Sequence, residues 1–136
     1  MVIALTAVIP NSAWGAGAFV GAWSDNADRL KSLGNLTVTS DSLAIGRTVT
    51  YTIADEETFG TGVLYKVTHV SRRKDPFGCG PQMKVQYIAV RPLPAIEGTN
   101  WRSIDVFLWG GPSKPQPASI ESQPGVCIDH TFGRAP

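Results

Sequence analysis

Histidines and nearby carboxylates, the usual carriers of acid–base chemistry, are sparse in this chain. His69 and His130 are its only histidines, whereas nucleophilic catalysis needs a base between a nucleophile and an orienting carboxylate. Asp129 adjoins His130, but neighbouring strand residues point to opposite faces, so the two form no orienting pair. His69 shares the alternation of the apolar residues in 63–67, which predicts a satisfied side chain on the barrel face of a strand.

The other patterns that could bind a metal or cofactor do not have the required spacing. Asp55–Glu57 is a carboxylate run without the ligand spacing of an EF-hand, so a solvated turn is expected there. The glycines at 15, 17 and 21 do not match a dinucleotide loop, and no Gly-x-Ser-x-Gly occurs. We therefore expect no catalytic residues, no metal and no cofactor, and hence no enzyme. Dispersed carboxylates that include Asp105 are the enzymatic alternative.

Two cysteines, Cys79 and Cys127, lie 48 positions apart and belong to no Cys-x-x-Cys pair. Together with two distant histidines they do not provide the local ligand spacing of a zinc site. In an exported chain the pattern predicts one disulfide, which would stabilise the fold by about 4 kcal/mol through loop closure. In a cytosolic chain two buried free thiols are the alternative.

Composition sets the limits within which these residues must be positioned. The chain has 136 residues, of which 43% are hydrophobic and 17% charged, with a net charge of +1. This length predicts one domain, and the charge balance argues against a nucleic-acid partner. Fourteen glycines and ten prolines indicate short elements and many turns.

The first eighteen residues resemble the end of a secretory signal. Residues 1–9 are apolar apart from Thr6, Pro10 breaks the run, and small residues precede candidate cleavage points after Gly15 and Ala18. The apolar run is too short to span a membrane, and no basic residue precedes it. We expect a complete or truncated signal at 1–18, a mature domain at 19–136, and a periplasmic or extracellular location. An N-terminal strand is the alternative reading.

Apolar residues alternate with polar ones through most of the remaining chain, as expected for half-buried strands. Ser24–Lys31 has the capping and charge pattern of a short helix. The predicted fold class is mainly β: a small antiparallel up-and-down barrel of about seven short strands with one short N-terminal helix. The strands are expected at 36–39, 43–45, 48–53, 63–70, 83–91, 101–109 and 126–132, with a charged turn at 55–60 and an irregular loop at 110–125.

The opening Gly21-x-Trp23 resembles the first strand of calycin-type small barrels, which include lipocalins and short bacterial metalloprotease inhibitors. The resemblance implies that Trp23 closes one end of the barrel, with Gly21 beside it, as structural residues. The chain lacks the C-terminal helix of lipocalins and the early cysteine of the inhibitors. A large internal ligand cavity is therefore not expected.

Two surface features remain as candidate binding sites. Between Lys66 and Arg91 six basic residues accompany one acid, a local charge of +5, and Arg72, Arg73 and Lys74 followed by Phe77 form the candidate partner-binding loop. A solubilising loop is the alternative.

The second feature is aromatic. Trp101, Phe107 and Trp109 share one strand face opposite Ile104, Val106 and Leu108. They form a candidate aromatic patch or ligand site, or else lie under the loop at 110–125.

Together these features predict a small exported, non-catalytic β-barrel binding protein. Its expected partner is another protein, a hydrolase that it inhibits through the basic loop. The alternative is a lipocalin-like carrier of a small hydrophobic ligand. No nucleic-acid partner and no membrane span are expected.

Overall fold

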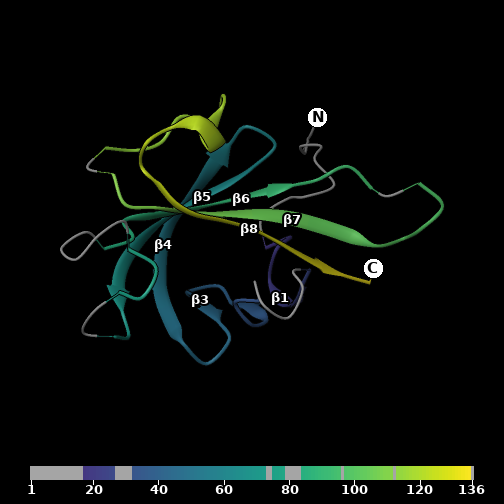
Figure 1. Cartoon of the computed structure of the whole chain (residues 1–136), viewed down its shortest axis with the longest axis horizontal. Helices are drawn as coiled ribbons and strands as arrows, with labels where there is room; N and C mark the ends of the chain where they lie inside the picture. The colour runs from purple at the N-terminus through teal and green to yellow at the C-terminus, as the bar shows by residue number, and fades with distance from the viewer. Residues whose placement is uncertain are drawn as a thin grey trace, which may run out of the picture.

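Eight strands, each hydrogen-bonded to the next in sequence, form one closed antiparallel barrel in the computed structural model of the chain (Figure 1). The structure describes residues 17–26, 32–72, 75–78, 84–95, 97–111 and 113–135. The strands are β1 (Gly21–Asp25), β2 (Leu36–Val38), β3 (Ser42–Ile45), β4 (Val49–Phe59), β5 (Gly62–Val70), β6 (Tyr87–Pro92), β7 (Arg102–Trp109) and β8 (Val126–Arg134). The mainly-β antiparallel barrel is thus confirmed, with eight strands rather than about seven. Closure leaves no unpaired outer strand.

The predicted N-terminal helix is wrong where the structure can test it. Ser24 and Asp25, expected to begin that helix, instead end β1 and pair with Gly133 and Phe132 of β8. Residues 27–31 lie outside the described residues, which contain no α-helix. Local capping preferences were outweighed here by strand pairing that closes the barrel.

The expected charged turn at 55–60 is also wrong, because β4 continues through it to Phe59. The chain reverses at Gly60 and Thr61 instead. A bulge between Ala54 and Glu57 shifts the register with β5, and Asp55 takes a φ of 54°. The bulge places the extra charged residues outside the regular pairing, so the run remains compatible with a strand.

Large apolar side chains fill the barrel interior. The buried cluster consists of Phe19, Trp23, Leu36, Val38, Leu43, Ile45, Val49, Tyr51, Ile53, Val63, Tyr65, Val67, Val85, Ile88, Val90, Ile104, Val106, Leu108 and Phe132. Leu33, Val70, Phe77 and Ile128 pack against it from its margin. The interior is therefore a packed core.

A second, smaller core lies on the outer surface of the barrel. Ile120, in the 3₁₀ turn η1 (Ile120–Ser122), is fully buried with Phe107 of β7. Phe59, Leu64 and Ala89 complete this cluster. The connection 110–125 therefore acts as a strap, which arches over one side of the barrel in Figure 1, and the alternation predicted for β7 is confirmed.

Gly21 and Trp23 form one unit with Arg134 of β8. The Arg134 guanidinium lies 3.8 Å from the centre of the Trp23 ring, and it donates hydrogen bonds to the carbonyls of Ala18 and Val20. The Trp23 indole N–H donates to the Phe19 carbonyl at 2.9 Å. Gly21 has a φ of 128°, and a Cβ there would lie 2.5 Å from an Arg134 nitrogen. Glycine is thus required for Arg134 to reach the indole.

We predict that Gly21→Ala lowers the free energy of unfolding by about 3 kcal/mol, because backbone strain adds to displacement of Arg134. Gly98→Ala is the matched control: its φ is 80°, but a Cβ there would meet nothing within 4 Å. That control should lose only the strain component, about 1 kcal/mol. Urea unfolding compares the two variants, and equal losses would contradict the role assigned to Arg134.

Candidate functional site

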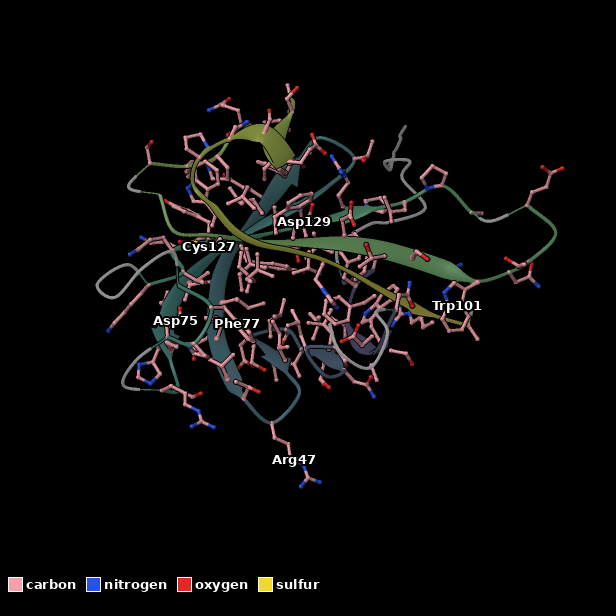
Figure 2. The ribbon with its side chains drawn as sticks, viewed as in Figure 1. Arg47, Asp75, Phe77, Trp101, Cys127 and Asp129 are labelled. Atoms are coloured by element: carbon pink, nitrogen blue, oxygen red, sulfur yellow. The ribbon has the colours of Figure 1, made fainter. Side chains whose placement is uncertain are left out.

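Arg72 and Phe77, the described candidate residues of the basic loop, lie at one end of the barrel, here called the loop end. It carries the connections 26–35, 46–48, 71–86 and 110–125, since these all join strands on the same side. Figure 2 shows Asp75 and Phe77 together at this end, Arg47 projecting away from the barrel, and Trp101 at the opposite end.

Asp75 holds the connection between β5 and β6 against the barrel. One carboxylate oxygen accepts hydrogen bonds from the Tyr51 hydroxyl at 2.8 Å and the Phe77 N–H at 3.0 Å. The other accepts the Val85 N–H at 2.8 Å. Its negative charge is therefore directed inward. In the sequence, Asp75 is distinguished only as the single acidic residue among six basic ones between Lys66 and Arg91.

The predicted basic loop is only partly described. Arg72 is exposed, and its guanidinium donates to the carbonyls of Thr48 and Arg47, which fastens it to the turn between β3 and β4. Phe77 is half-buried against the core. Arg73 and Lys74 lie outside the described residues. Arg72 therefore presents its charge from a fixed position.

His69 does not occupy the barrel face predicted for it. A register shift pairs Thr52 with His69 but Ile53 with Val67. Thr68 is therefore the extra residue of β5, with no residue of β4 opposite it in the pairing. Because strand side chains alternate, this one-residue bulge turns His69 to the exposed surface. The apolar alternation of β5 gave no indication of the bulge.

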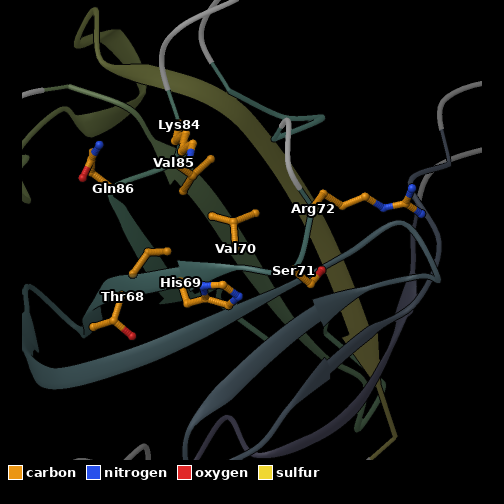
Figure 3. Close-up of a pocket in the computed structure, with 9 residues that line it drawn as sticks. Thr68, His69, Val70, Ser71, Arg72, Lys84, Val85 and Gln86 are labelled. Atoms are coloured by element: carbon orange, nitrogen blue, oxygen red, sulfur yellow. The ribbon is translucent and has the colours of Figure 1, made fainter.

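A slot opens in the barrel wall beside His69, where the end of β5 and the segment 84–86 diverge (Figure 3). Its volume is about 480 Å³. The last backbone bond that joins its two sides runs from the Val67 N–H to the Gln86 carbonyl, at 2.9 Å. The lining residues are Val67, Thr68, His69, Val70, Ser71, Arg72, Lys84, Val85 and Gln86. Lys84 and Gln86 were not identified from sequence, because they lie outside any recognisable motif.

His130 of β8 joins β8 to β1 through its side chain. Its Nε2 lies 2.7 Å from an Asp25 carboxylate oxygen, and its ring packs edge-on against Phe132. The other Asp25 oxygen accepts the backbone N–H groups of Leu33 and Gly34. The carboxylate paired with His130 is thus that of Asp25, while the adjacent Asp129 is exposed.

Asp105, the candidate carboxylate of the enzymatic alternative, is fully engaged. One of its oxygens accepts the Thr131 hydroxyl at 2.7 Å, and the other pairs with Arg91 at 3.1 Å. Arg91 also pairs with Glu121 of the strap and lowers the pKa of that carboxylate. This arrangement fastens the strap to the barrel.

The three predicted aromatic residues lie in different environments. Phe107 is fully buried under the strap, and Trp109 is nearly so, with its indole N–H donating to the Ser113 carbonyl at 2.7 Å. Trp101 is half-buried at the other end of β7, beside Gly133, where any side chain would collide with its indole. They therefore form no continuous exposed patch.

Cys127 lies half-buried on β8 and is not a free thiol. Cys79 lies outside the described residues, so the pairing of the two remains a prediction. Among the described residues no three side chains of His, Cys, Asp or Glu group as metal ligands. No helix within the described ranges has the length and apolarity needed to cross a membrane.

Comparisons of the chain with protein-family models, with curated proteins and with solved structures find no match.

We predict that the protein loses stability as the pH rises above about 10, the ordinary pKa of tyrosine. Burial, reinforced by Asp75, raises the pKa of Tyr51, and burial together with Glu56 raises that of Tyr65. The unfolded chain therefore releases these protons more readily than the folded chain, so deprotonation favours unfolding.

An alkaline titration that follows tyrosinate absorbance and circular dichroism together checks this prediction. The buried phenols should ionise in the same cooperative step as unfolding, and Tyr51→Phe should remove one tyrosinate from that step. Reversible ionisation of Tyr51 near pH 10 in the folded protein would contradict it.

Proposed function

We propose that this chain is an exported, non-catalytic binding protein of the calycin-like type, which docks a hydrolase through a basic rim at the loop end. The basic rim consists of Arg47 and Arg72, with Arg73 and Lys74 expected beside them from the sequence. The observation that carries the proposal is the anchoring of Arg72: its guanidinium is bonded to the backbone of the turn that bears Arg47. A fixed cation loses less conformational freedom on binding than a free one.

The charge distribution at this end supports an acidic partner surface. Asp75, the carboxylate of this connection, turns inward to three hydrogen-bond donors. Among the described residues it therefore forms no salt bridge with Arg47 or Arg72. A rim of one sign steers an oppositely charged surface and raises the association rate, in a manner that salt weakens.

The packed core supports a protein partner over the carrier alternative. A carrier of small hydrophobic ligands needs an internal cavity, whereas Trp23, Tyr51 and Phe132 are each at most 1% exposed within the barrel cluster. Phe77 and Leu33 pack at its margin. Binding would therefore use the outside of the barrel.

We predict that the protein inhibits a member of a panel of secreted proteases and glycosidases, and that reversing the rim charge weakens this inhibition. Arg47→Glu combined with Arg72→Glu should raise the inhibition constant at least tenfold at low salt, and less at high salt.

Arg102→Glu is the control for each of the two single rim variants, since it reverses one charge on an exposed residue at the opposite end of the barrel. It should leave inhibition within about twofold of the unmodified protein. Equal losses in the single rim variants and in this control, with native circular dichroism, would reject the rim as the docking surface.

We also predict the form of the exported chain. The start expected from the sequence is Phe19, whereas cleavage after Gly15 would keep the Ala18 carbonyl that accepts a hydrogen bond from Arg134. Intact-mass analysis of the exported protein should find a chain that begins at Phe19 or at Ala16 and lacks two hydrogen atoms, as one disulfide requires. Retention of Met1 with two reduced thiols would contradict export.

A further inference from the structure

We propose that the slot between β5 and the segment 84–86 binds the C-terminal carboxylate of a polypeptide whose last side chain is aliphatic. This inference goes beyond the proposed function and stands without it: the slot shares Arg72 with the basic rim, but it can be tested without a hydrolase. The slot is built from His69, Lys84 and Gln86 over a floor of valines.

Three polar side chains of the slot are available to a ligand. Within the described part of the chain, no hydrogen bond or ion pair engages the side chains of His69, Lys84 or Gln86. Two other polar groups of the lining already have hydrogen-bond partners in the protein: Arg72 donates to the Thr48 carbonyl, and the Ser71 hydroxyl accepts the Thr50 N–H. The described lining of the slot contains no carboxylate. Its available groups are an ammonium, an imidazole and an amide, and this combination favours an anionic ligand.

The floor of the slot selects an apolar group next to that anion. Val67 and Val85 are 9% and 2% exposed, and Val70 is half-buried against the core. Figure 3 shows Val70 and Val85 from the two sides of the slot, with Lys84 and Gln86 along one side and His69 on the other. A volume of about 480 Å³ is within the range of small-ligand sites and accommodates a terminal residue with its carboxylate.

The backbone beside the slot favours a peptide as the source of the carboxylate. β5 stays paired with β4 as far as Val70, opposite Tyr51. On its other side, among the described residues, no backbone bond joins 68–70 to 84–86 after the bond between Val67 and Gln86. This short length of strand edge can pair with one extended residue of a ligand, as in other domains that capture chain ends.

The test is a titration of the ¹⁵N-labelled protein with the acetylated tripeptide acid Ac-Gly-Gly-Val, with its C-terminal amide, and with isovalerate. The tripeptide acid should shift the amide signals of 68–71 and 84–86 saturably at millimolar concentration or below. The amide should bind at least tenfold more weakly, because it lacks the charge that Lys84 and His69 bind. Isovalerate should also bind more weakly than the tripeptide acid, since it cannot pair with the strand edge.

Lys84→Gln should weaken binding of the tripeptide acid about tenfold. Lys66→Gln is the matched control: Lys66 lies on β5, three positions before His69 of the slot, but it lines a separate hollow with Asp55 and Glu57. It should change the affinity less than twofold. Both substitutions are at exposed positions, and thermal unfolding verifies that each variant remains folded.

Three results would overturn the proposal: equal binding of the acid and amide peptides, no saturable shift at millimolar concentration, or equal losses in the two lysine variants. Isovalerate that binds as tightly as the tripeptide acid would overturn the assignment to a peptide and indicate a free aliphatic acid instead. None of these results bears on the hydrolase partner, which is tested apart from the slot by Arg47→Glu alone, because Arg47 does not line the slot whereas Arg72 does.

Discussion

Closure of the barrel between β1 and β8 is the constraint on which the rest of this structure depends. β1 has only five residues, and its register with β8 covers Ser24 opposite Gly133 and Asp25 opposite Phe132. So short a ladder contributes few backbone bonds. Its position is reinforced by side chains that cross the seam at both ends, and an unclosed sheet would expose two unpaired strands.

The side chains that cross the seam differ in chemistry, but each holds a neighbouring segment of backbone against it. Towards the end where β1 begins, Arg134 packs on the Trp23 ring and holds the preceding backbone through two carbonyls. Towards the loop end, Asp25 pairs with His130 and holds the returning chain at Leu33. The Asp25 carboxylate pairs with His130, and the Arg134 guanidinium, which has no carboxylate partner among the described residues, is held by two carbonyls and the Trp23 ring.

Bulges determine which side chains the barrel offers to other molecules. The bulge at Thr68 turns His69 outward, next to the point where the pairing of β5 with β6 ends at Lys66 and Tyr87 and the slot opens. The bulge at Asp55 and Glu56 lets a charged run stay within β4. In both cases one or two extra residues change the outer surface while the packed interior is preserved.

The strap explains why an aromatic strand does not make an aromatic binding surface. Ile120 inserts over Phe107, and Arg91 joins the strap to β7 through Glu121 and Asp105. The outer face of β7 is thus a second core. Binding functions are therefore proposed for the loop end, where cationic groups remain exposed.

Several features followed from the sequence. Alternation located most strands because a half-buried strand must present apolar residues every second position, as in 49–53 and 104–108. The same alternation predicted that the adjacent residues Asp129 and His130 point to opposite faces of their strand. The Gly21-x-Trp23 motif marked the first strand, although the reason for its glycine, the approach of Arg134, needed the fold.

What the sequence by itself determined is therefore the class of fold, the alternation of its strands and the sparseness of catalytic groups, since all three depend on residue type and local spacing. Only the tertiary structure decided that Ser24 and Asp25 close a barrel rather than begin a helix, that His69 faces outward, and that Lys84 and Gln86 share a slot with it. The physical reason is that these outcomes depend on pairing register and bulges between distant segments, which local preferences are too weak to determine.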